Sequence, residues 1–280
     1  MQAFSEFRHM PPSFWAMIKY VSETLGYTIR RQGVVRTYSV DDIHSLLSRN
    51  GIVVDHETIE AASLYFDMRA DLLNNVVRHN LMNATEAKAA FESLYPLYCN
   101  NNFKCKLPMN KQKGPLKQIA FFTAIINILA EDTLRHSSVY DGSLGFNDDP
   151  GGLAYVFDSA HHIIGASSRR FDGAYPHILN PRIVWEIKEY YYATTFGSRV
   201  ADGVYETQLD GYEFKDIAQR SGNPITHVFF LDAYKTWWID GKSYLCRIID
   251  ILNAGFVDEV IVGREVFNRW PELLSSIIEE

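Results

Sequence analysis

Cysteine is scarce in this chain of 280 residues, which contains only Cys99, Cys105 and Cys246. The set is odd and sparse; Cys99 and Cys105 could form a disulfide, but the five residues between them match no usual zinc-ligand spacing. No secretory signal peptide is recognisable at the Met1 end. We therefore expect a cytoplasmic protein whose thiols are reduced.

Long apolar runs and several common functional motifs are also missing. The longest mainly apolar stretch, residues 119–130, has 12 residues, whereas a bilayer span needs about 20. The segment "DGKS" at residues 240–243 lacks the earlier glycine of a phosphate loop, because Thr236 occupies that position. No Gly-rich dinucleotide fingerprint and no serine or cysteine nucleophile elbow is present. We therefore expect no membrane partner, and these motif-defined enzyme classes are not indicated.

The composition is that of a globular protein, with 47% hydrophobic and 22% charged residues. The formal net charge of −7 argues against a protein coated in nucleic acid. It leaves open a local basic cleft, or a metal-dependent enzyme whose carboxylates hold the ion.

The first 110 residues are predicted to form a mainly helical region. Apolar spacing and N-cap residues predict helices over residues 14–25, 39–51, 58–81 and 84–95, the last of them stopped by Pro96. Residues 27–38 predict two short strands around Gly33, in a basic hairpin that contains Arg30, Arg31 and Arg36. This region is either a module for DNA recognition or dimerisation, or an ordinary helical subdomain with a solvated basic turn. The polar, lysine-rich residues 100–114 are predicted to form a linker.

Residues 111–280 show a different alternation, typical of a mixed sheet. After a helix over residues 115–136, the pattern predicts strands at 153–157, 162–166 (continuing toward Asp172) and 183–191, a helix at 198–219, a strand at 227–232, a helix at 244–254 and a strand at 259–262. This order predicts an α/β or α+β fold in which helices flank a mixed central sheet.

One predicted strand, "IVWEIKEYY" from Ile183, contains two charged residues. Of four acid-x-lysine pairs in the chain, only Glu186 and Lys188 fall in a strand, where residues two apart face the same side about 7 Å from each other. Asp172 precedes Glu186 by thirteen intervening residues, at the end of a predicted strand where Gly173 allows a turn. Two carboxylates at neighbouring strand ends suit Mg²⁺, and a lysine beside them can orient a water molecule. The alternative is a cross-strand ion pair on a wet sheet face.

The segment "FDG" followed by "VWEIK", in this strand order, resembles the PD-(D/E)xK nuclease superfamily over residues 115–265. Phe171 stands where the family name has proline, a position that varies in the superfamily. The resemblance implies a restriction-endonuclease-like fold in which Asp172, Glu186 and the carbonyl of Ile187 bind Mg²⁺. It implies that Lys188 positions the attacking water.

The same resemblance implies a Mg²⁺-dependent endonuclease that hydrolyses double-stranded DNA, of a type II restriction or defence type. A homodimer is expected because cutting both strands calls for two sites. The alternatives are a RecB-like exonuclease or repair nuclease, and a non-catalytic DNA-binding protein with the same fold.

Further residues are candidates for supporting roles. Glu131 matches a place where some members of the superfamily contribute an additional acid. Gln208 and Tyr212 are spaced i, i+4 and resemble the Gln-x-x-x-Tyr element of the RecB-like branch, although such spacing is also routine in an amphipathic helix. Arg169, Arg170 and Arg199 either meet phosphates or are ordinary surface arginines.

Overall fold

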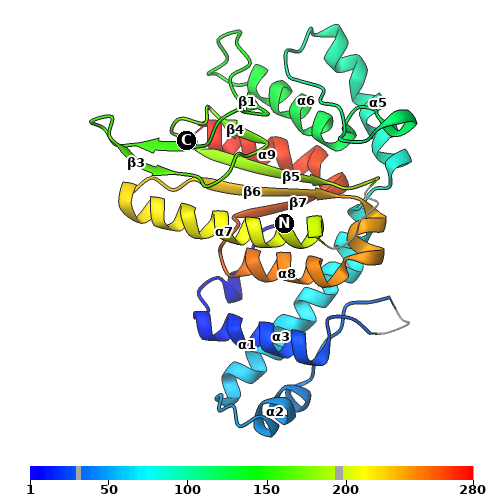
Figure 1. Cartoon of the computed structure of the whole chain (residues 1–280), viewed down its shortest axis with the longest axis vertical. Coiled ribbons are helices and arrows are strands. Elements are labelled where there is room, and N and C mark those ends of the chain that lie inside the picture. The colour runs from blue at the N-terminus through cyan, green and yellow to red at the C-terminus, as the bar shows by residue number, and fades with distance from the viewer. Residues whose placement is uncertain (30–32, 193–197, 280) are drawn as a thin grey trace.

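A mixed sheet organises the larger part of the molecule (Figure 1). In the computed structural model, which describes residues 1–29, 33–192 and 198–279, five strands lie in the order β1-β4-β5-β6-β7. β1 (Asn147–Asp148), β4 (Gly173–Tyr175) and β5 (Ile183–Glu189) are antiparallel neighbours, whereas β6 (Thr226–Asp232) and β7 (Glu259–Val262) continue the sheet in parallel. The predicted mixed sheet is confirmed.

A separate two-stranded sheet precedes β4 in the chain. It consists of β2 (Tyr155–Phe157) and β3 (Ile163–Ala166). The predicted continuation of the second strand toward Asp172 is wrong, because β3 ends at Ala166 and β4 begins only after Asp172. Asp172 therefore precedes a strand of the central sheet instead of ending a strand of the hairpin.

Helices cover both faces of the central sheet. α6 (Phe121–Arg135) and α9 (Val266–Glu279) pack on one face, and α7 (Ser198–Ser221) and α8 (Lys242–Asn253) pack on the other (Figure 1). Alternate residues of β5 enter the two layers, so that Trp185 joins the α6/α9 core while Val184 packs with α7. α9 lies beyond the last element predicted from the sequence. Short helical segments complete this part: η3 (Gly114–Leu116), η4 (Tyr234–Asp240) and η5 (Gly263–Glu265).

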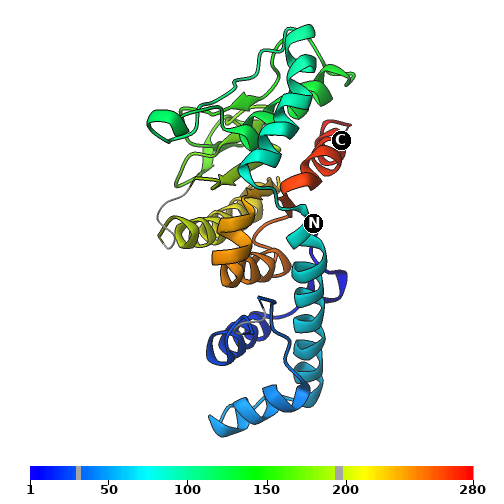
Figure 2. The ribbon, with the colours of Figure 1, turned by 90° about the vertical axis from the view of Figure 1, so that its right-hand side faces the viewer.

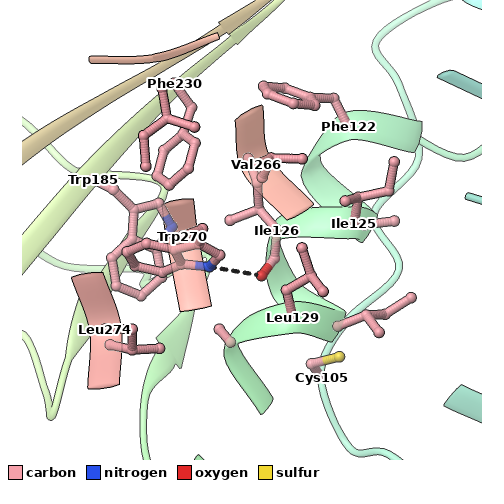
Figure 3. Packing of buried hydrophobic residues seen from close by; sticks show 14 of the residues in the cluster. Cys105, Phe122, Ile125, Ile126, Leu129, Trp185, Phe230, Val266, Trp270 and Leu274 are labelled. Carbon is pink, nitrogen blue, oxygen red and sulfur yellow. Dashed lines mark hydrogen bonds between the residues drawn. The ribbon is translucent and has the colours of Figure 1, made fainter. Parts of the chain in front are cut away.

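The core of the α6/α9 layer is built around two tryptophans (Figure 3). The rings of Trp185 and Trp270 lie 5.1 Å apart, and Trp270 Nε1 donates a hydrogen bond of 3.1 Å to the carbonyl of Ile126. Trp185 faces Gly173 across the β4–β5 pair, and a Cβ atom on Gly173 would overlap its indole ring. Gly173 is therefore required for close approach of the tryptophan, and not for the turn that the sequence predicted.

The N-terminal region is helical, as predicted, and has its own core. Its elements are η1 (Ser5–Phe7), α1 (Pro12–Leu25), α2 (Val40–Arg49) and α3 (His56–Asp71), followed by η2 (Leu72–Val77), α4 (Arg78–Asn80) and α5 (Ala84–Asn100). From α3 onward the chain leads from this region to the part of the molecule that contains the sheet (Figure 2). In the predicted hairpin, one antiparallel bridge joins Thr28 and Val35, while Arg30 and Arg31 lie outside the described residues.

The predicted stop at Pro96 is wrong, because α5 continues through the proline to Asn100. The missing N–H costs one helical hydrogen bond. Beyond the proline, however, Leu97 and Tyr98 pack against the α6/α9 core. Tertiary burial therefore outweighs the local cost of the proline.

A buried ion pair joins the helical region to α8. Arg69 is fully buried, and one of its guanidinium nitrogens lies 2.9 and 3.1 Å from the two carboxylate oxygens of Asp250. Tyr65 donates a hydrogen bond of 2.6 Å to the same carboxylate. Breaking such a pair leaves an uncompensated buried charge, so this contact fixes the helical region against the sheet domain.

Residues 100–114, the predicted linker, pack against α6. Phe103 and Cys105 are buried, and the backbone N–H groups of Lys104 and Cys105 donate to the carboxylate of Glu131. The segment is thus part of the surface of the sheet domain. Within the described residues, no helix has the length and apolar character that a membrane crossing requires.

His227, on β6 beneath α7, is a buried base. The rings of Phe171 and Phe214 lie 6.0 and 5.3 Å from its ring, and its Nδ1 lies 3.1 Å from the carbonyl of Phe256. Its Nε2 has no hydrogen-bond partner among the described residues. Burial lowers the pKa of His227 to about 4. The imidazole is therefore neutral in the folded protein, with its proton on Nδ1.

We expect His227 to make the fold sensitive to acid. Between its ordinary pKa of about 6.5 and its folded value of about 4, the unfolded chain binds a proton that the folded protein excludes, so stability is lost as the pH falls. His227→Gln should reduce the loss in free energy of unfolding between pH 7 and pH 4.5 by about 2 kcal/mol, measured by urea unfolding. His44→Gln, at an exposed histidine of α2, is the control. Equal pH dependence in wild type and His227→Gln would contradict the assignment.

We expect Gly173→Ala to displace Trp185 and lower the free energy of unfolding by about 1–3 kcal/mol, as overpacking of a core does. Gly151→Ala is the matched control, because a Cβ at Gly151 meets no atom within 4 Å. Denaturant unfolding and tryptophan fluorescence measure both effects. A Gly173→Ala variant as stable as Gly151→Ala would show that the indole does not need this space.

Candidate active site

The register of β4 and β5 places the predicted acidic residues side by side. Gly173 pairs with Trp185, and the backbone N–H of Asp172 donates a hydrogen bond of 3.0 Å to the carbonyl of Trp185. Asp172 lies just before β4, and its Oδ2 accepts a hydrogen bond of 2.7 Å from the backbone N–H of Ile187, the residue between Glu186 and Lys188. Glu186 and Lys188, two residues apart on β5, share a face. All three residues line one cleft. The structure thus brings together the three predicted catalytic residues.

These residues line a cleft of about 550 Å³. Its walls come from residues 108–112, the start of α6, the end of β5 and the first turns of α7. Six acidic side chains line it: Asp149, Asp172, Glu186, Glu189, Asp202 and Glu206. The predicted alternative of an ion pair on a wet sheet face does not describe this site, since α7 covers the face and Glu186 is only 6% exposed.

Asp172 is a buried carboxyl group with an acidic neighbour. Burial and the charge of Glu186 raise the pKa of Asp172 to about 7, although the backbone N–H of Ile187 donates a hydrogen bond of 2.7 Å to its Oδ2. Two carboxylates in this arrangement repel each other, and a cation between them relieves the repulsion.

Lys188 is held between two glutamates. Its Nζ lies 2.5 Å from Glu186 Oε1 and 3.1 Å from Glu206 Oε2. Burial opposes the charge of the ammonium group, but Glu186, Tyr190 and Glu206 together outweigh it and raise the pKa of Lys188 above its ordinary value. Its stem runs along α7, where a Cβ atom on Gly203 would lie 3.2 Å from Lys188 Cε. Lys188 is therefore a fixed cation beside the two carboxylates.

Arg169 occupies the other side of Glu186. One guanidinium nitrogen lies 3.0 Å from Glu186 Oε2, and the guanidinium also donates to Asp210 at 2.7 and 3.0 Å. Asp210 is fully buried, and burial raises its pKa to about 6 even with Arg169 as a partner. Arg169 was predicted to contact DNA, but its guanidinium is engaged by these two carboxylates. It holds Glu186 in place from the side of α7.

The acidic face of α7 was missed at the level of the sequence. Glu206 and Asp210 contact the site, and Glu213 accepts a hydrogen bond of 2.9 Å from the backbone N–H of Ser168, which precedes Arg169. Their spacing of i, i+4 and i+7 places all three on one helical face. This spacing is the sequence pattern that could have indicated an acidic face on α7.

The predicted pair Gln208 and Tyr212 does not line the cleft. Tyr212 is exposed, and its ring packs 4.4 Å from that of Phe256, which precedes β7. Gln208 is half-buried on the same helix, away from the face that carries Glu206. Gln208 and Tyr212 share a face of α7, as the i, i+4 spacing predicts, but this face is not the one that contacts the site.

Three further predicted residues, Glu131, Arg36 and Arg170, are not among the residues that line the cleft. Glu131 is buried, and its carboxylate accepts hydrogen bonds from two backbone N–H groups of residues 104 and 105 and from Arg135. Arg36 donates a hydrogen bond of 2.7 Å to the carbonyl of Leu25 in the N-terminal region. Arg170 is exposed beside Arg169, and the side chain of Arg199 lies outside the described part of the structure.

The oxygen atoms at this site fit Mg²⁺, which binds one or two carboxylates and keeps several waters. The N–H of Ile187 points to Asp172, and the carbonyl of a strand residue points to the same side as its N–H, so the Ile187 carbonyl faces the same edge. Among the described residues, no three Asp, Glu, His or Cys side chains form a ready cluster of metal ligands. The candidate ligands remain the two side chains and one carbonyl that the resemblance implies.

Comparison with protein families divides the chain into two parts. The model described as "Domain of unknown function (DUF7687)" matches residues 82–277, and the chain belongs to this family. A second model, "Domain of unknown function (DUF7690)", matches residues 1–76. No curated protein and no solved structure matches the chain. The two models meet between residues 76 and 82, whereas the predicted boundary lies at residue 110.

We expect Arg169→Met to lower the free energy of unfolding by about 3 kcal/mol, because it leaves Asp210 buried without its partner. The double variant Arg169→Met/Asp210→Leu removes both charges and should recover most of this loss. Arg220→Met is the control, since Arg220 and Asp216 form an exposed pair at 2.9 Å whose removal costs at most about 1 kcal/mol. Denaturant unfolding measures all three. An Arg169→Met variant no less stable than the control would argue against the buried pair.

Proposed function

We propose that this protein is a Mg²⁺-dependent DNA endonuclease of a type II restriction or defence type. The observation that carries the proposal is that Asp172, Glu186 and Lys188 line one cleft of about 550 Å³, where the Asp172 carboxylate accepts a hydrogen bond from the N–H of Ile187, between the other two residues. The motif resembles that of the PD-(D/E)xK nucleases, and the mixed sheet between two helical layers is compatible with their fold. The proposed setting is the cytoplasm, where double-stranded DNA is the substrate.

The residues present divide the chemistry of phosphodiester hydrolysis among them. Asp172, Glu186 and the Ile187 carbonyl would hold Mg²⁺, which when bound supplies charge for activating water and neutralising phosphate. Lys188, fixed by Glu186 and Glu206, orients the attacking water through its ammonium group. In-line attack on phosphorus breaks the bond to the 3′ oxygen and leaves a 5′-phosphate.

The remaining acidic and basic residues act indirectly. Arg169, itself held by Asp210, keeps Glu186 from rotating away from Asp172. A homodimer is part of the proposal, because cleavage of both strands calls for two such sites. The helical region matched by the second family model would provide target recognition or dimer contacts. An exonuclease of RecB-like type has less support, since Gln208 and Tyr212 do not line the cleft.

We expect the wild-type protein to convert supercoiled plasmid to nicked and linear forms in Mg²⁺, and not in EDTA. Lys188→Ala should lower the rate about 100-fold or more, because it removes a fixed cation at the reacting phosphate. Asp172→Asn should do the same by weakening metal binding. Agarose gels of supercoiled and linear DNA over time provide the measurement.

Lys235→Ala is the matched control, since Lys235 is exposed on η4 and does not line the cleft. Circular dichroism and thermal unfolding verify that each variant folds. Full activity in Lys188→Ala would contradict the site assignment. Discrete fragments indicate an endonuclease, gradual loss from the ends indicates an exonuclease, and binding without cleavage in Mg²⁺ or Mn²⁺ would indicate a non-catalytic DNA-binding protein.

A further inference from the structure

A hairpin-like loop leads into α6 and forms part of the cleft wall. We define the basic loop as residues 108–120, whose stem is closed by a bridge between Met109 and Ile119. The N–H of Asn110 donates a hydrogen bond of 2.9 Å to the carbonyl of Gln118, and the Asn110 side chain bonds to the backbone of Leu116 and Gln112. The tip of the loop, residues 111–117, therefore has a defined shape.

The basic loop is tied to the strand that carries the candidate active site. Gln118 Nε2 donates a hydrogen bond of 2.9 Å to the hydroxyl of Tyr192, three residues beyond the end of β5. Residues 108–112 line the same cleft as Asp172 and Glu186. The loop joins α5 to α6, at the opposite end of the molecule from α1 and α2 (Figure 1). It lies far from the N-terminal hairpin in which DNA contacts were first predicted.

The charge of this segment differs from that of the whole chain. Residues 93–130 contain five lysines and no Asp or Glu, although the chain has a net charge of −7. Lys104 and Lys106 donate hydrogen bonds to the backbone of Gly142 and Asp148. Lys111, Lys113 and Lys117 are exposed and form no ion pair with any residue that the structure describes. Three ammonium groups are therefore available on the loop, and Lys111 itself lines the cleft.

The cleft and the basic loop beside it have opposite charges. Six acidic side chains line the cleft, and an anionic ligand can approach them only together with a cation. The basic loop carries Lys111, which lines the cleft, and Lys113 and Lys117, which follow it in the chain, and three lysines suit a ligand with several phosphates. A nucleic acid that extends from the candidate metal site along the basic loop would satisfy both parts.

We propose that the basic loop binds the phosphate backbone of a nucleic acid, through Lys111, Lys113 and Lys117, and guides it to the cleft. This inference rests on the proposed function, because the bound nucleic acid is also the substrate. The contacts are to phosphates and carry no sequence information. Arg169, in contrast, belongs to the ion-pair cluster beneath the cleft.

The test is the affinity of the full chain for a fluorescent 20-base-pair duplex, measured by anisotropy at several salt concentrations with Ca²⁺ in place of Mg²⁺. In the variant Lys111→Glu/Lys113→Glu/Lys117→Glu, we expect the Kd to rise about tenfold or more. The slope of log Kd against log salt should fall by about 2 to 3, since each phosphate contact contributes about 0.9. The corresponding triple glutamine variant should show the same change in slope and a smaller rise in Kd.

The matched control is Lys88→Glu/Lys215→Glu/Lys235→Glu, which changes the net charge equally at exposed lysines outside both the cleft and the region that the second family model matches. Equal weakening in both triple variants, or wild-type binding that does not depend on salt, would overturn the inference. If the wild type binds DNA through the basic loop but cleaves it in no metal, the proposed nuclease function is refuted and phosphate binding by the loop is supported. If the triple glutamate variant still cleaves DNA with an unchanged Kd, phosphate binding by the loop is refuted and the nuclease function is not affected.

Discussion

The packing of Trp185 over Gly173 is the contact on which the candidate site depends. A side chain at Gly173 would exclude the indole ring, so this glycine allows β4 and β5 to pair at that point while Trp185 stays in the α6/α9 core. The same pairing brings Asp172, just before β4, to Ile187 of β5, whose N–H donates a hydrogen bond to the Asp172 carboxylate beside Glu186. Trp270, against which Trp185 packs, belongs to α9 near the end of the chain (Figure 3). The geometry of the acidic pair thus depends on hydrophobic packing from a distant part of the sequence.

Buried charges form the second layer of this arrangement. Glu186 is compensated on both sides, by Arg169 and Lys188, and these cations are in turn held by Asp210 and Glu206 of α7. Such a cluster tolerates burial because each charge has a partner at short distance. It fixes the rotamers of the acidic and basic groups before any substrate arrives. The free lysines of the basic loop lie outside this cluster, and this separates groups that hold the site from groups available to a ligand.

Much of the fold could be predicted from local patterns. The N-terminal helices and the strands at 183–189, 226–232 and 259–262 have strong apolar periodicity, and apart from the end of α5 their predicted bounds agree with the structure within about two residues. β1 and β4 are too short for a periodic signal. The helix beyond residue 265 was overlooked, although Val266, Trp270 and Leu274 recur at helical spacing. The predicted helix end at Pro96 is wrong because tertiary packing outweighs the local tendency of proline to end a helix.

The sequence by itself determined that Glu186 and Lys188 share a face, because the period of a strand is two residues whatever surrounds it. It also indicated Asp172 as their partner, by chain distance and chemistry. Only the tertiary structure decided which side of α7 meets them. Gln208 and Tyr212 have the same i, i+4 spacing as Glu206 and Asp210, so spacing alone does not show which pair faces the site. The orientation of α7 about its axis, which buries Phe214 and Ile217 against the sheet, decides it. Local periodicity defines faces, whereas long-range packing decides what each face contacts.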